Sequence, residues 1–220
     1  KNIVYTEGRK ISRRDFKLNA INDNVQKQYT LPLVKKIQNL APGSKVDQAR
    51  IAVSLVQHIP YGASDEVVDL GEQQINYSRF PYEVLYDDEG ICGEKTELMA
   101  LLLREIGYGT SFFFWPMENH EALGIKCPVE ESFQDTGYCF VESTMPAIIS
   151  DSELRYRGVG KLSDNVNVYH LSKGFSLPED IYEYKDRDKL QSIKQNDVFR
   201  KGAHEKLQEK YGLGGEYRVT

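Results

Sequence analysis

The run from Leu98 to Leu103 is apolar at nearly every position, and Gly107, a residue type that often ends helices, follows it. A helix with apolar side chains on all faces must be surrounded by other elements, so this run predicts a buried helix at the centre of the fold. The helix is expected to begin near Cys92, directly after a tight turn at Gly90. A chain of 220 residues is long enough to bury such a helix in one domain of ordinary to large size.

Apolar residues at helical spacing predict two further helices upstream, over residues 24–39 and 45–58. Ser44 is a suitable N-cap for the second helix, and the run 59–62 ends it. Residues 63–80 are polar and lack periodicity, so we expect an irregular loop there. A loop of this length often carries function.

Dense apolar runs after the buried helix predict strands over residues 110–115, 120–125 and 138–141, with an acidic exposed connection at 128–136. Residues 165–171 are expected to add one more strand. A helix followed by consecutive strands indicates an α+β fold in which the central helix packs against a mostly antiparallel sheet.

Three regions of one domain follow from these patterns. Residues 1–44 are expected to form an N-terminal arm and helix packed on the core, and residues 45–150 form the core itself. Residues 151–220 are expected to extend the same domain, with charged, helical residues at 186–211 and a tail at 212–220.

Cys92 is the predicted nucleophile. A thiol in the first turn of a helix faces unpaired N–H groups and the positive end of the helix dipole, which favour the reactive thiolate. A nucleophilic cysteine needs a base, and the base needs a third group that fixes its tautomer. His120 and Glu142 each lie at or in a strand-like run downstream, so we assign them these two roles.

The predicted strands also suggest how these groups meet. On neighbouring antiparallel strands, His120 and Glu142 can share one face of the sheet. Strand alternation places Ala122 and Gly124 on the face of His120, and their small size leaves room for a helix. We therefore expect the Cys92 helix to pack on that face.

An acyl-transfer site also needs donors for an oxyanion. The backbone N–H of Cys92 is the first candidate. Gln74 and Tyr77, in the loop that precedes the helix, are the candidates for a second donor. The acidic residues 87–89 are expected either to offset the helix dipole or to attract a cationic substrate group.

Three runs, Phe80–Leu85, Gly90–Lys95 and Leu101–Tyr108, resemble the transglutaminase-like superfamily, as does the lead-in Val56–Tyr61. The similarity covers roughly residues 45–150 and implies a papain-like fold.

The resemblance implies a Cys-His-Asp triad, with Cys92 on the nucleophile position and His120 at the start of the strand that carries the family histidine. This chain departs from the pattern at Glu142, where the family usually has aspartate, and at Ile91, where many members have aspartate.

The resemblance therefore predicts a cysteine-dependent acyl-transfer enzyme that acts on peptide or amide bonds through a thioester. We expect a hydrolase (a protease, peptidase or amidase) with a peptide or protein substrate. Hydrolysis is favoured because the sequence has no calcium-loop pattern and no accessory modules. Two alternatives stay open: transglutaminase crosslinking, in which an amine resolves the thioester, and an inactive binding or scaffold module.

A zinc site is the main alternative use of cysteine, histidine and glutamate, but the sequence has neither C-x-x-C nor paired H-x-x-x-H spacing. No metal and no cofactor are predicted. Cys127 and Cys139 either pair or remain as two buried thiols, which leaves the redox compartment open.

The formal net charge of -5 and the lack of a basic stripe argue against a nucleic-acid partner. No apolar run approaches the length of a membrane span. Because the chain starts at Lys1, an excised domain or mature form stays open, and with it a removed signal or anchor and an extracytoplasmic location.

Overall fold

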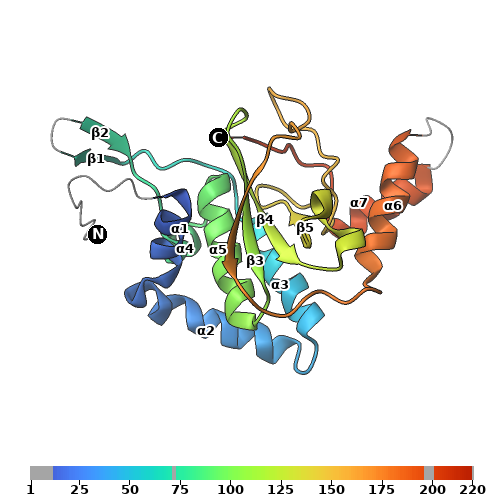
Figure 1. Ribbon diagram of the computed structural model, residues 1–220, viewed down its shortest axis with the longest axis horizontal. Coiled ribbons are helices and arrows are strands. Elements are labelled where there is room, and N and C mark those ends of the chain that lie inside the picture. Colours follow the sequence, from blue (N-terminus) through green and yellow to red (C-terminus); the bar gives the residue numbers. More distant parts are fainter. Residues whose placement is uncertain (1–11, 71–72, 196–200, 220) are drawn as a thin grey trace.

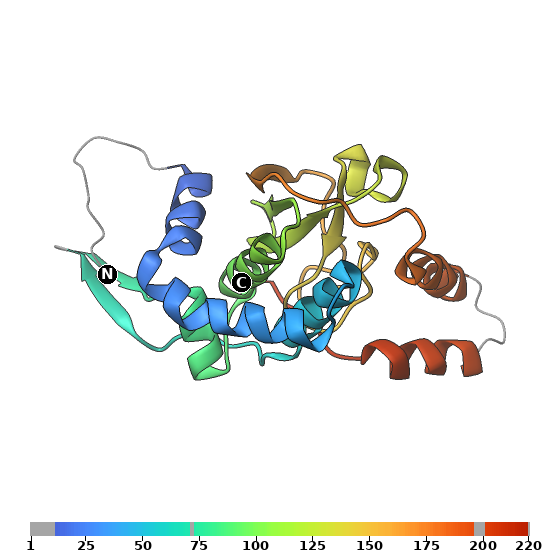
Figure 2. The ribbon, with the colours of Figure 1, turned by 90° about the horizontal axis from the view of Figure 1, so that it is seen from below.

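Helix α5 (Cys92–Ile106) is the central element of the structure, a computed structural model that describes residues 12–70, 73–195 and 201–219. Nearly all of its side chains are buried. Figures 1 and 2 show helices gathered around one side of it and a sheet along another. The helices that contact it are α1 (Arg13–Asn22), α2 (Asn24–Leu40), α3 (Lys45–His58) and α4 (Pro81–Asp87).

The sheet is four-stranded and antiparallel, in the order β5-β4-β3-β6. Its strands are β3 (Thr110–Trp115), β4 (His120–Lys126), β5 (Tyr138–Val141) and β6 (Asn167–Ser172). The predicted α+β class with a mostly antiparallel sheet is confirmed. Because β6 pairs with β3, the C-terminal third of the chain completes the sheet built by the core.

The remaining elements lie at the two ends of the molecule. The hairpin β1 (Val67–Leu70)–β2 (Gln73–Asn76) projects from one end, and α6 (Tyr182–Gln195) with α7 (Lys201–Tyr211) forms the other (Figures 1 and 2). Two 3-10 turns, η1 (Val129–Glu131) and η2 (Phe133–Asp135), connect β4 to β5.

Local capping explains why the helices begin and end where the sequence predicted. The Ser44 hydroxyl accepts the Asp47 N–H at 3.2 Å and starts α3, as expected. Asp23 accepts two N–H groups in the first turn of α2. Gly107 ends α5 with φ +118, in the left-handed region where glycine is favoured.

Helix α5 packs on the opposite face of the sheet from the one expected. It shares a core with Leu123 and Ile125, whereas Ala122 belongs to a second apolar cluster with Phe113 and Trp115. A Cβ on Gly124 would lie 2.9 Å from the Phe113 ring. Aromatic side chains therefore fill the space in which we expected the helix to pack. Large apolar residues at 123 and 125 bury more area against α5, which decides the face.

Two further expectations were wrong. The predicted loop 63–80 contains the hairpin β1–β2, which was missed because its strands are only four residues long and show no regular apolar–polar alternation. The predicted tail is not free of the body, because the Tyr217 hydroxyl donates to the Pro146 carbonyl at 2.9 Å. Residue 220 and residues 1–11 of the predicted arm lie outside the described residues.

Candidate active site

The structure brings Cys92, His120 and Glu142 together. His120 is the first residue of β4 and is fully buried, and its Nε2 lies 3.1 Å from Glu142 Oε2. The other ring nitrogen, Nδ1, is also buried. The Cys92 side chain, 2% exposed, is close enough to influence the ionisation of the ring. The imidazole is therefore flanked by a carboxylate and a thiol.

Strand register explains the pairing of acid and imidazole. Leu123 of β4 faces Val141 of β5. Continuing this register by one residue sets Glu142 against Ala122, two residues from His120 and on the same face. Cys92, the first residue of α5, lines one pocket with Asn119 and Glu121, the residues on either side of His120, so the thiol lies near the start of β4.

Both ionisable partners are strongly perturbed. Burial acts to lower the pKa of His120, but the adjacent Glu142 carboxylate and Cys92 outweigh it and raise that pKa. Burial acts to raise the pKa of Glu142, but His120 and the donors around the carboxylate outweigh it and lower that pKa. The pair is therefore held as imidazolium and carboxylate.

Five donors surround the Glu142 carboxylate. Oε1 accepts the Ser143 N–H at 2.9 Å, the Thr144 N–H at 2.8 Å and the Thr144 hydroxyl at 2.7 Å. Oε2 accepts the Tyr156 hydroxyl at 2.5 Å as well as facing His120. These donors fix both oxygens, so the carboxylate can orient the imidazole without moving.

The C-terminal part of the chain supports Tyr156. The Tyr156 ring lies 4.7 Å from the His120 ring and 5.8 Å from the Tyr217 ring, measured between centroids. Backbone bonds join residues 156–157 to residues 160 and 217. Sequence patterns did not mark Tyr156, because an isolated tyrosine outside regular elements has no local signature.

The first turns of α5 are tied to the Glu142 segment. The Thr96 hydroxyl lies 3.0 Å from the Ser143 hydroxyl, and the latter donates to the Cys92 carbonyl at 3.3 Å. From α3, the Gln57 side chain donates to the Glu142 carbonyl at 2.9 Å. Cys92 and Glu142 are thus linked through buried polar contacts as well as through the imidazole.

A small pocket of about 130 Å³ opens beside Cys92. Its polar wall includes Lys17 from α1 and Glu121 from β4, and the strand residue Phe114 contributes an apolar side. Lys17 Nζ lies 2.8 Å from Glu121 Oε2 and 2.7 Å from Glu97 Oε1, and all three side chains are buried. Lys17 therefore joins the helix that carries the thiol to the strand that carries the imidazole.

This buried cluster has unusual protonation. Burial raises the pKa of Glu97 to about 7, although Lys17 acts against the shift. Burial acts to lower the pKa of Lys17, but the two carboxylates outweigh it and raise that pKa. A single buried lysine next to the pocket could not be found from sequence, since α1 carries no pattern that marks one face as buried.

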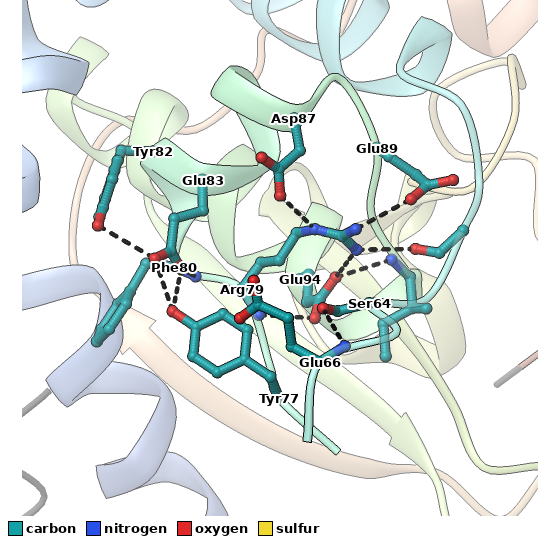
Figure 3. A network of polar contacts seen from close by, with 12 residues as sticks. Ser64, Glu66, Tyr77, Arg79, Phe80, Tyr82, Glu83, Asp87, Glu89 and Glu94 are labelled. Carbon is teal, nitrogen blue, oxygen red and sulfur yellow. Dashed lines mark hydrogen bonds and ion pairs between the residues drawn. The ribbon is translucent and has the colours of Figure 1, made fainter. Parts of the chain in front are cut away.

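A network around Arg79 holds the segment that leads into α5 (Figure 3). Its guanidinium contacts Asp87 at 2.8 Å and Glu89 at 2.9 Å, so these two acids serve an internal ion network. Glu94 accepts the N–H of Arg79 at 2.7 Å and that of Ile91 at 3.1 Å. The start of the thiol helix is thereby fixed against the preceding loop.

The two side-chain candidates for an oxyanion donor, Gln74 and Tyr77, each contact an acidic side chain. Gln74 is exposed on the projecting hairpin, and its amide donates to Asp69 at 3.1 Å. The Tyr77 hydroxyl donates to the Glu83 carboxylate at 2.6 Å, as Figure 3 shows. Ser78 and Asn119 line the pocket beside Cys92, whereas Gln74 and Tyr77 do not belong to its lining.

Cys127 and Cys139 form a disulfide, which resolves the alternative left open by the sequence. Cys139 of β5 pairs with Ile125 of β4, and Cys127 lies two residues after Ile125. Within the described ranges, no group of three or more His, Cys, Asp or Glu side chains is arranged to hold a metal ion. None of the described helices has the length and apolar character of a membrane span.

No protein-family model matches the chain, and no curated protein matches it.

Proposed function

We propose that the protein is a cysteine-dependent acyl-transfer enzyme of papain-like type that hydrolyses a peptide or amide bond. The observation that carries this proposal is the fully buried imidazole of His120, flanked by the Glu142 carboxylate and the Cys92 thiol. A structural role alone does not require an imidazolium–carboxylate pair beside a thiol and a pocket.

In the proposed reaction, the proton of the Cys92 thiol already resides on His120 as the imidazolium described above, and the sulfur attacks the substrate carbonyl carbon. The tetrahedral oxyanion is stabilised by backbone N–H groups in the first turn of α5, where no intrahelical acceptor exists. The C–N bond then breaks, and His120 protonates the leaving amine. A thioester to Cys92 remains.

Water resolves the thioester. His120 takes a proton from the water molecule, the hydroxide adds to the thioester carbonyl, and the carboxylic acid leaves as the thiol is reformed. Glu142 holds the ring in one orientation throughout and stabilises its charged form. An amine in place of water would give crosslinking, the alternative drawn from the resemblance of residues 45–150 to transglutaminase-like proteins.

A second candidate is a binding or scaffold module without turnover. The low exposure of Cys92, 2%, and the small pocket favour this alternative, because a substrate carbonyl must reach the sulfur. Glu142 in place of the usual aspartate of the resembled family is compatible with either proposal.

Alkylation of Cys92 separates these proposals without knowledge of the substrate. The intact protein is treated with iodoacetamide over a pH series, and labelling is followed by mass spectrometry. The enzyme proposal expects Cys92 to react at pH 6 faster than in the unfolded chain, with the advantage lost in His120→Ala. Equal rates in folded His120→Ala and wild type would overturn it and favour the scaffold.

Product analysis then distinguishes hydrolysis from crosslinking. The protein is incubated with casein and a fluorescent alkylamine, with Cys92→Ala as the control. Release of new peptide termini or ammonia without amine incorporation supports hydrolysis, whereas Cys92-dependent incorporation of the amine supports transamidation.

A further inference from the structure

Lys95 is fully buried in α5, one helical turn after Cys92. Its ammonium group donates to the Ile59 carbonyl at 2.5 Å and to the Thr144 carbonyl at 3.0 Å, and the Gln57 carbonyl lies 3.5 Å away. An ammonium group has three donors, and three carbonyls surround it. These carbonyls come from the end of α3 and from the segment after β5, two parts of the chain that the Gln57 side chain also joins through the Glu142 carbonyl.

The Thr144 contact places Lys95 in a closed circuit. Thr144 presents its carbonyl to Lys95, while its N–H and hydroxyl hold Glu142 Oε1. Glu142 Oε2 faces His120, whose ring is influenced by Cys92. The circuit begins at Cys92 and returns to the same helix at Lys95. A rigid helix therefore sets the distance between the nucleophile and the segment that carries the acid.

We propose that Lys95 is a positioning residue for the Cys92–His120–Glu142 site, acting through the Thr144 carbonyl to hold the Glu142 carboxylate against the imidazole. The proposal rests on the function proposed for that site. Lys95 touches none of the three groups directly, and its role is to keep the segment 142–144 at a fixed place relative to α5.

The surroundings of Lys95 make this role depend on its charge. The charged group that acts on it is Glu142, and its aliphatic stem packs near Gly90. Burial lowers the pKa of Lys95 to about 8, although Glu142 acts against the shift. A neutral amine has only two donors, so one of the three carbonyls then faces a lone pair and the segment 142–144 loosens.

The test compares wild type with Lys95→Met in the full chain, using iodoacetamide labelling of Cys92. We expect labelling at pH 6.5 to fall by about tenfold to a hundredfold in Lys95→Met, the cost of a small misplacement of catalytic groups. The wild-type advantage should shrink as the pH rises through about 8, where Lys95 loses its charge. Lys45→Met is the matched control, because Lys45 donates to the Ile106 carbonyl at the far end of the same helix.

Lys95→Gln is measured in parallel, since its amide retains two donors and keeps the site testable if the methionine variant does not fold. Equal labelling of folded wild type and either variant at pH 6.5 overturns the proposal. A ratio of wild-type to variant labelling rates that does not change as the pH rises through 8 also overturns it. His120→Ala separates failure of the Lys95 proposal from failure of the proposed function. If His120→Ala abolishes rapid labelling of Cys92 while Lys95→Met does not, only the role of Lys95 is refuted. If His120→Ala has no effect on labelling, the proposed function is refuted.

Discussion

The Tyr156 hydroxyl donates to Glu142 Oε2 at 2.5 Å, the same oxygen that lies 3.1 Å from His120 Nε2. Glu142 Oε2 thus accepts from His120 on the sheet and from Tyr156 in the irregular segment that follows β5. Because both side chains are buried, this second donor helps to hold Glu142 ionised.

Replacing Tyr156 by Phe removes that donor and keeps the ring. We expect the free energy of unfolding at pH 7 to fall by about 1.5–3 kcal/mol, the range for hydrogen bonds to charged groups.

The effect of this variant should depend on pH. Burial acts to raise the pKa of Glu142, but His120 and the donors around the carboxylate lower it to about 2. The ionised form therefore contributes stability above about pH 4.5 that is lost as the pH falls toward 2. The effect of the variant should therefore shrink at pH 3. Urea unfolding at both pH values measures it, with the 88% exposed Tyr86→Phe as control. A loss that is as large at pH 3 would contradict this account.

Shortening Glu142 to Asp should impair the site even though aspartate is the usual residue in the resembled family. The backbone donors of residues 143 and 144 are fixed next to the present carboxylate, so a side chain one methylene shorter cannot keep them and His120 together. We expect Cys92 labelling at pH 6 to fall by at least about tenfold, equivalent to about 1.4 kcal/mol. Unchanged labelling would show that the length of the acid is not matched to this site.

A methyl group at residue 93 should disturb the ion cluster beside the pocket. The Cβ of Gly93→Ala would lie 2.9 Å from Glu121 Oε2 and 3.0 Å from Lys17 Nζ. Since both groups are buried and paired, we expect a loss of about 1–3 kcal/mol in stability, typical of overpacking. Gly202→Ala, in α7 with open space around it, should instead stabilise by about 0.5–1 kcal/mol. Thermal and urea unfolding compare the two variants, and equal effects would contradict the prediction.

Removing the cation of that cluster should destabilise the fold in a pH-dependent way. Lys17→Met leaves Glu97 and Glu121 buried without their lysine, which costs about 3–5 kcal/mol for a broken buried pair. Burial raises the pKa of Glu97 to about 7 despite Lys17, so its neutral form favours the fold and stability from this group is lost as the pH rises through 7. Without Lys17 the pKa of Glu97 rises further, and the loss should be larger at pH 8 than at pH 5.

Urea unfolding at pH 5 and pH 8 measures this difference. Lys161→Met is the control, because Lys161 pairs with Glu153 on the surface and such pairs contribute little. A penalty for Lys17→Met that falls with rising pH would refute the assignment.

The Cys127–Cys139 disulfide should support stability without serving the chemistry. It closes a short loop with a sequence separation of 12, for which chain entropy gives about 3 kcal/mol. A double Cys→Ser variant is expected to lose roughly this amount in urea unfolding. Labelling of Cys92 at pH 6 should stay unchanged, and a strong decrease would indicate that β4 and β5 need the disulfide to present His120 and Glu142.

The positions of helices could be predicted from the sequence where a local pattern of apolar and capping residues exists. The helix at 45–58 with Ser44 as its cap, and the buried helix that begins at Cys92, follow from periodicity and capping, which act within a few residues. The hairpin between Val67 and Asn76 was missed because its two strands are four residues each and show no regular alternation of apolar and polar residues. The prediction of which face of the sheet α5 covers was also wrong. The small residues at 122 and 124 lie on a face that aromatic rings fill, rather than on the face that packs against the helix.

By itself, the sequence determined the α+β class, the central helix, and the chain order of thiol, imidazole and acid, because each depends on residue type and on spacing within one element. Only the tertiary structure decided that Tyr156 donates to Glu142, that Lys17 lines the pocket beside Cys92, and that Lys95 meets the carbonyls of two distant segments. These contacts join parts of the chain far apart in sequence. Their formation depends on how whole layers pack, and no short-range pattern records that outcome.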